Sequence, residues 1–90
     1  MINFKQACEI AKRIRDLDFP SMKYIYITEL EDRWIFVLSV FSPEDKEYMT
    51  PAPMFFVFEE DGRVEWFSVP PFENLKLFEK GKEMGCLWQE

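Results

Sequence analysis

Histidine is absent from this chain of 90 residues, which also contains only two cysteines and three glycines. Without histidine, the chain cannot build a Ser/His/Asp or Cys/His catalytic set or a zinc site of the histidine-containing type. The two cysteines stand near opposite ends of the sequence and lack the spacing of metal ligands. The glycines do not form a phosphate-binding loop. We therefore expect a protein without enzymatic activity, metal or cofactor.

Long apolar runs are also missing. No stretch approaches the roughly 18 consecutive apolar residues of a membrane-spanning helix, and residues 1–30 lack the charged and apolar regions of a secretion signal. These absences predict a cytoplasmic protein without membrane contact, in which Cys8 and Cys86 are reduced. A disulfide between them remains an alternative that the sequence does not decide.

Basic side chains are in the minority, with 11 against 17 acidic ones and a net charge of −6. Residues 1–23 carry five basic and three acidic residues, so the acidic excess lies in the remainder of the chain. A protein that binds the phosphate backbone needs the opposite balance. The charge therefore argues against a nucleic-acid partner and favours a basic protein partner.

The most apolar stretch is residues 34–41, in which Ser39 is the one polar residue. Its β-branched and aromatic content predicts a central strand that is buried on both faces. The chain is long enough for one hydrophobic core and too short for two, so we expect a single domain over residues 1–90.

A helix is predicted over residues 4–18. Asn3 and Gln6 have the spacing of a capping box, and the helix should end before Pro20. An apolar stripe at helical spacing follows the cap: Phe4, Ala7, Cys8, Ala11, Ile14 and Leu17. Cys8 lies within this stripe, so we interpret it as a core residue.

Strands are predicted at 23–30, 33–41, 54–60 and 63–69, followed by a helix at 72–84. Asp61-Gly62 favours a type I′ hairpin between the last two strands. Alternation places Ile25 and Ile27 on the helix-facing side, and Trp34 and Trp66 are expected in the core. The predicted fold class is α+β, with the N-terminal helix packed on a four-stranded antiparallel β-meander and a short C-terminal helix.

Acidic residues cluster in two of the predicted hairpins. In an antiparallel meander these two turns lie at the same end of the sheet, which would gather six carboxylates against Arg33 and Arg63: Glu29, Glu31, Asp32, Glu59, Glu60 and Asp61. Such a surface either keeps the protein soluble or steers and seats a basic partner. Tyr26 and Trp88 are candidate aromatic anchors of the same interface.

The order of these features resembles the family-35 immunity domain of bacterial polymorphic-toxin systems. The resemblance rests on the N-terminal helix, the acidic hairpin, Trp34 and Phe36 in a Trp-x-Phe pattern, the apolar strand after Pro53, and the Asp61-Gly62 hairpin. It covers most of residues 4–69. It implies a non-enzymatic cytoplasmic protein that binds and neutralises a cognate toxin.

Two other classes of function remain open. The two-sided central strand and the apolar tail with Trp88 would suit a self-associating adaptor or structural domain, that is, a homodimer. The acidic composition would suit a phage-type inhibitor that mimics nucleic acid.

Overall fold

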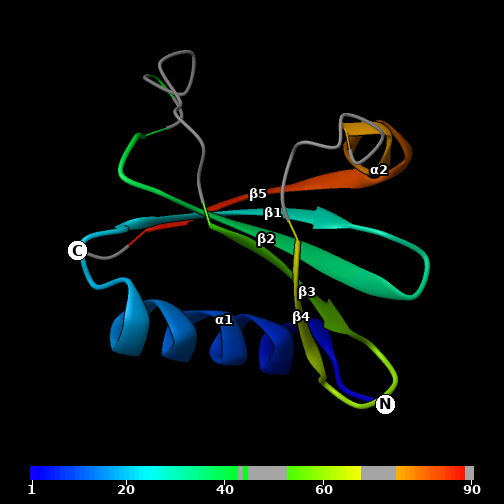
Figure 1. The fold of residues 1–90 in the computed structure, drawn as a ribbon. Coiled ribbons are helices and arrows are strands. Elements are labelled where there is room, and N and C mark those ends of the chain that lie inside the picture. The colour runs from blue at the N-terminus through cyan, green and yellow to red at the C-terminus, as the bar shows by residue number, and fades with distance from the viewer. Residues whose placement is uncertain (43, 45–52, 68–74, 89–90) are drawn as a thin grey trace.

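The computed structural model describes residues 1–42, 44, 53–67 and 75–88, which form a five-stranded antiparallel sheet with a helix against each face (Figure 1). The strand order is β4-β3-β2-β1-β5. The elements are α1 (Phe4–Asp18), β1 (Tyr24–Glu29), β2 (Arg33–Ser39), β3 (Met54–Phe58), β4 (Val64–Phe67), α2 (Leu75–Lys80) and β5 (Lys82–Trp88). The predicted α+β class, with its N-terminal helix, meander and C-terminal helix, is confirmed.

Helix α1 has the predicted bounds and the predicted cap. The Asn3 side chain accepts from the Gln6 amide at 2.8 Å, and the Gln6 side chain accepts from the Asn3 amide at 2.9 Å. At the other end the Phe19 amide donates to the carbonyl of Arg15 at 2.8 Å. Arg15 is buried, and its Nη1 donates to the carbonyl of Lys23 at 3.4 Å, which ties α1 to the start of β1.

The larger core lies between α1 and the sheet. Small residues Ala7, Cys8 and Ala11 line the helix side, which lets the backbone of α1 approach the strands closely. The sheet side is formed by alternate residues of three strands: Ile25, Ile27, Trp34, Phe36, Leu38, Phe55 and Val57. The predicted helix-facing positions of Ile25 and Ile27 and the predicted core position of Trp34 are therefore confirmed. Trp66 instead is 49% exposed, because it lies on the edge strand β4 and only part of its ring packs on Phe19 and Phe55.

The opposite face of the central strand is covered as well. Ile35 and Val37 are buried there beneath Leu77 and Phe78 of α2 and the side chains of neighbouring strands. The ring of Phe67 stacks on Phe56 with centroids 4.2 Å apart and lies 6.3 Å from that of Phe78, which links β3, β4 and α2. The prediction of a strand buried on both faces is confirmed for residues 34–39, whereas the predicted continuation to residue 41 is wrong, because β2 ends at Ser39 and Val40 is 50% exposed.

The C-terminal part of the chain differs from the prediction. The helix expected at 72–84 is shorter, covering 75–80 within the described residues, and residues 82–88 form the fifth strand. The Gly81 amide donates to the carbonyl of Leu77 at 3.1 Å and closes the helix. β5 then pairs with the edge of β1 that the four-stranded meander leaves open. Long-range pairing therefore overrides the helical preference of Lys82, Glu83 and Met84.

The second acidic hairpin also departs from the expected geometry. A type I′ turn needs two residues with positive φ, whereas Gly62, at φ 74°, is the one such residue in this turn. Residues 59–62 form a four-residue loop in which the Gly62 amide donates to the carbonyl of Phe58 at 2.8 Å. The position of the hairpin is as predicted, and its turn type is corrected.

Candidate functional site

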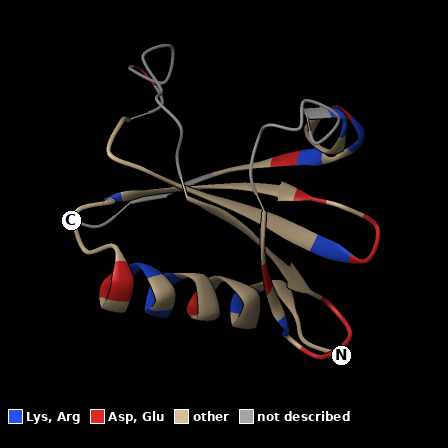
Figure 2. Ribbon diagram, viewed as in Figure 1, with Lys and Arg blue, Asp and Glu red and all other residues tan. Residues whose placement is uncertain are grey.

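The two acidic turns lie at the same end of the sheet, as the meander predicts (Figure 2). The Glu59 amide donates to the carbonyl of Asp32 at 3.0 Å, so the β3–β4 turn is joined directly to the β1–β2 turn. The Ile2 amide donates to the carbonyl of Glu59 at 2.8 Å and brings the N-terminal segment to the same place. Backbone hydrogen bonds thus hold three separate segments of the sequence together.

Each turn is closed by its own local chemistry. Glu31 and Asp32 form a two-residue connection in which the Leu30 amide donates to the carbonyl of Arg33 at 2.8 Å. In the β3–β4 turn, Oδ1 of Asp61 accepts from the Arg63 amide at 2.9 Å. A side chain at Gly62 would lie within 3.3 Å of Cδ1 of Ile10, so glycine also allows this turn to pack closely on α1.

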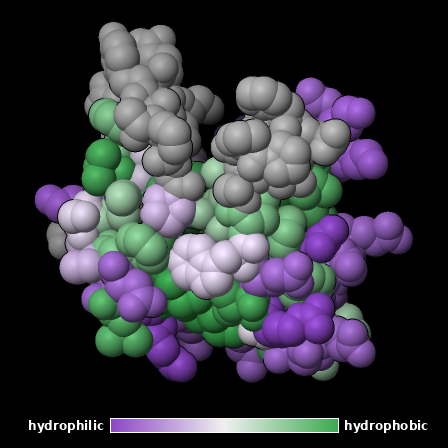
Figure 3. Space-filling model, viewed as in Figure 1, coloured by the Kyte–Doolittle hydropathy of each residue, from purple (hydrophilic) through white to green (hydrophobic). Residues whose placement is uncertain are grey.

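Four of the six predicted carboxylates surround one shallow hollow of about 220 Å³. It is lined by Met1, Glu31, Asp32, Glu59 and Glu60. We call the four carboxylates the acidic end. The space-filling view shows hydrophilic residues gathered on this side of the molecule (Figure 3).

The arginines expected to neutralise this cluster are largely engaged elsewhere. The guanidinium carbon of Arg33 lies 4.3 Å from the centroid of the Phe56 ring, and that of Arg63 lies 4.3 Å from the Phe58 ring. Nε of Arg33 is 3.5 Å from Oδ1 of Asp32, which is an ion pair without an aligned hydrogen bond. Within the described part of the chain, no ion pair joins the other three carboxylates to a cation. Asp32 is therefore the one member of the acidic end that has an ion pair in the described part of the chain.

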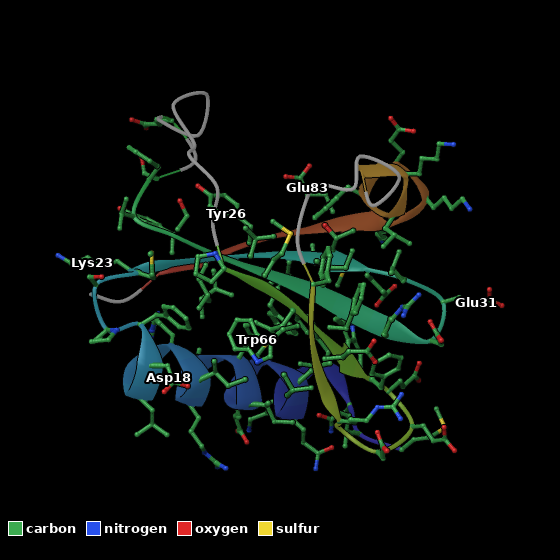
Figure 4. The ribbon with its side chains drawn as sticks, viewed as in Figure 1. Asp18, Lys23, Tyr26, Glu31, Trp66 and Glu83 are labelled. Atoms are coloured by element: carbon green, nitrogen blue, oxygen red, sulfur yellow. The ribbon has the colours of Figure 1, made fainter. Side chains whose placement is uncertain are left out.

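The remaining predicted site residues lie outside the acidic end. Glu29 is paired in the sheet between Trp34 and Lys82, and Asp61 uses its carboxylate to close its own turn. Tyr26 lies on the face of the sheet away from α1, as Figure 4 shows. Trp88 belongs to β5, opposite Tyr24, and its side chain lies outside the described residues. The predicted set thus divides into one cluster and four separate positions.

Tyr26 contributes to a second hollow, which we call the outer pocket. It has a volume of about 260 Å³ and is lined by Tyr26, Ile27, Thr28, Val37, Phe78, Glu83 and Gly85. Phe78 belongs to α2, and Glu83 and Gly85 belong to β5. Sequence reasoning missed them because they join the pocket only through the pairing of β5 with β1, for which the sequence carries no local signal.

Cys8 is a free, buried thiol in the α1 core, in agreement with its predicted role. Burial raises the pKa of this thiol above its ordinary value, so the reactive thiolate is disfavoured. The side chain of Cys86 lies outside the described residues. Among the described residues, no group of three or more His, Cys, Asp or Glu side chains is arranged to hold a metal ion.

Neither helix in the described part of the chain has the length and apolar character needed to cross a membrane. No protein-family model matches the chain, and comparisons with curated proteins and with solved structures give no match. The acidic end and the outer pocket are therefore features of the molecule that bear on its function.

Proposed function

We propose that this protein is a non-enzymatic binding protein of the immunity type, which neutralises a basic bacterial toxin domain in the cytoplasm by direct contact. The observation that carries the proposal is the convergence of two hairpin turns into one acidic end, where Asp32 is the one carboxylate with an ion pair among the described residues. The family resemblance of residues 4–69 points to the same class of partner. Since the chain has no histidine and its described thiol is buried, binding is favoured over catalysis.

The rigidity of the acidic end supports this function. The Glu59–Asp32 and Ile2–Glu59 hydrogen bonds tie both turns and the N-terminal segment before any partner arrives. A partner then loses little free energy in ordering these segments, so more of the contact energy is available for affinity.

The charge of the acidic end supports it as well. Like charges held together at one end of a small domain create a field that attracts a basic surface and speeds the formation of the complex. Such steering raises association rates by about 10-fold to 1000-fold and weakens as salt is added. The acidic end is thus better suited to fast capture of a toxin than to providing most of the binding energy.

The test first asks whether a toxin-like protein is encoded next to this gene, and then compares two variants of equal net charge for binding to that protein. The first removes the acidic end: Glu31→Gln, Asp32→Asn, Glu59→Gln and Glu60→Gln. The matched control removes four exposed carboxylates elsewhere: Glu9→Gln, Asp18→Asn, Glu44→Gln and Glu79→Gln. The measurements are the association rate at several salt concentrations and the survival of cells that co-express the toxin.

We expect the acidic-end variant to associate at least about 10-fold more slowly and to lose most of its salt dependence. The control variant should change the rate by less than about 3-fold, since its charges are spread over α1, α2 and the position of Glu44. If both variants slow association equally, net charge alone acts and the acidic end is a solubilising surface. The absence of a toxin-like reading frame beside the gene would contradict the immunity proposal.

Self-association is the alternative that draws least support from the fold. The outer face of β2, one reason to expect a homodimer, is buried beneath α2 and neighbouring strands within the same chain. The apolar tail, the other reason, pairs as β5 with β1. Light scattering at high protein concentration tests directly whether the protein is a monomer or a homodimer.

The nucleic-acid mimic is the other alternative, and it predicts that DNA or RNA competes with this protein for a shared partner.

A further inference from the structure

The sheet has two edge strands, β4 and β5, and they differ in regularity. The pairing of β5 with β1 shifts register between Ile27 and Thr28, and Gly85 has a positive φ of 99°. Such irregular positions keep an edge strand from pairing with another chain. β4 instead pairs with β3 without a register shift from Val64 to Phe67. Within the part of the chain that the structure describes, no strand lies on the other side of β4.

The backbone of β4 directs hydrogen-bonding groups away from the sheet. The Phe58 amide donates to the carbonyl of Arg63 at 2.9 Å, so these two residues form a hydrogen-bonded pair of the ladder. In an antiparallel ladder such pairs alternate with pairs that exchange no hydrogen bond. Glu65 therefore also turns its backbone groups to β3, whereas the N–H and C=O groups of Val64 and Trp66 point to the open side. Among the described residues, no hydrogen bond occupies these outward groups.

Trp66 places an aromatic side chain beside these backbone groups. Its ring lies 5.0 Å from that of Phe55 and 5.8 Å from that of Phe19, and about half of the residue stays exposed. Figure 4 shows Trp66 between β4 and α1. Val64 lies on the same face, packed against the α1 core. A strand added at β4 would cover the exposed part of the indole, and buried tryptophans are among the residues that contribute most to binding.

Glu65 selects the charge of such a strand. It pairs with Phe56 on the face of the sheet away from α1, and its side chain is exposed. No ion pair within the described residues joins Glu65 to a cation. In an antiparallel pair, opposite charges that face each other across the two strands are stabilising and like charges are destabilising. The matching residue is therefore Lys or Arg, placed between two apolar residues that face Val64 and Trp66.

The net charge of the protein separates two occupants of this edge. Each copy carries a net charge of −6, so a second copy is repelled, whereas a basic strand is attracted. The basic toxin domain proposed above meets this requirement. The charge therefore favours a strand of the partner over a strand of a second copy.

We propose that β4 receives an extended segment of the basic protein partner as an added antiparallel strand, with Lys or Arg opposite Glu65 and apolar residues opposite Val64 and Trp66. This inference rests on the proposed function for the nature of the partner. The backbone hydrogen bonds provide affinity, and the facing side chains provide the preference for sequence. The acidic end then sets the speed of association, whereas the β4 edge contributes to the lifetime of the complex.

The test uses the isolated protein and a synthetic peptide, so it does not depend on the toxin. The Lys peptide is N-acetyl-Thr-Thr-Val-Lys-Val-Thr-Thr-amide. One control, the Glu peptide, has Glu in place of Lys. The second control carries N-methyl groups on both Val amides, which removes the donors to β4. Binding is followed by NMR of the labelled protein, together with hydrogen exchange of the Val64 and Trp66 amides.

Two protein variants of equal net charge complete the test. Glu65→Lys reverses the charge at the β4 edge, and Glu9→Lys makes the same change at an exposed position of α1. Glu65→Lys should weaken binding of the Lys peptide about 5-fold or more and should strengthen binding of the Glu peptide. Glu9→Lys should change either affinity by less than about 2-fold.

We expect saturable shifts along β4 with a Kd of about 5 mM or lower for the Lys peptide. The bound peptide should also slow hydrogen exchange at the Val64 and Trp66 amides. The inference is overturned if these amides exchange equally fast with and without peptide, if the N-methylated peptide binds equally well, or if the Glu peptide binds as well as the Lys peptide.

Two further outcomes separate this inference from its alternatives. A dimer in light scattering, with the Val64 and Trp66 amides already protected, assigns the edge to a second copy and overturns the inference. Absence of peptide binding, with toxin association still slowed by loss of the acidic end, removes the added strand and leaves the proposed function standing.

Discussion

The indole of Trp34 provides a test of how the core is built. Trp34 is 6% exposed, its ring lies 6.2 Å from that of Phe4, and its Nε1–H has no hydrogen-bond acceptor within the described part of the chain. A buried donor without an acceptor destabilises the folded state, because the donor loses its hydrogen bond to water and gains none in the protein. We therefore predict that Trp34→Phe leaves the free energy of unfolding within about 1 kcal/mol of wild type.

Two opposing effects set this value. Replacing indole by phenyl removes the equivalent of two to three buried methylene groups, which costs about 2 kcal/mol. Removing the unpaired N–H recovers about 1–3 kcal/mol of desolvation. The two effects nearly cancel. Phe36→Leu is the matched control, because Phe36 is fully buried on the same face of the same strand and its side chain has no unpaired polar atom. Phe36→Leu should therefore lower the free energy of unfolding by about 2 kcal/mol.

The assay is urea denaturation followed by far-ultraviolet circular dichroism, which does not depend on the tryptophan signal. Both variants should keep the wild-type dependence on urea, because the surface exposed on unfolding hardly changes. If Trp34→Phe loses as much stability as Phe36→Leu or more, the indole N–H has a partner in solution and the reasoning fails. Trp34→Ala should cost about 3–5 kcal/mol and shows that the position is sensitive.

Two further predictions concern the C-terminal segment and Cys8. Gly81→Ala should destabilise the protein by about 1–3 kcal/mol in thermal or urea unfolding, because the added methyl group would clash with Cγ2 of Thr28 and lie 3.0 Å from the carbonyl oxygen of Glu29. An unchanged midpoint of the unfolding transition would contradict the close packing of α2 and β5 on β1. In the folded protein, burial raises the pKa of the Cys8 thiol above its ordinary value of 9.0, so as the pH rises the unfolded chain loses this proton before the folded protein does. The free energy of unfolding should therefore fall as the pH rises through about 9. Cys8→Ala should remove that part of the pH dependence, and an identical alkaline profile would refute this origin.

The elements near the start and the middle of the chain were predictable because their signals are local. The Asn3–Gln6 capping box and the apolar stripe set α1 at 4–18 without reference to the rest of the fold. The composition of residues 34–41 likewise indicated a strand with two buried faces, which the structure shows over residues 34–39. The meeting of the two acidic turns also followed from the sequence, since an antiparallel meander puts alternate turns at one end. Four of the six predicted carboxylates line that end.

What the sequence by itself determined is thus the class of fold, the limits of α1, the central strand and the concentration of acidic residues in two turns. The tertiary structure alone decided that residues 82–88 join the sheet beside β1, and that Arg33 and Arg63 stack on aromatic rings. It also brought Tyr26, Phe78 and Glu83 into one pocket. The physical reason is that capping and hydrophobic periodicity act between residues a few positions apart, whereas strand pairing and ring stacking join residues whose proximity no local pattern encodes.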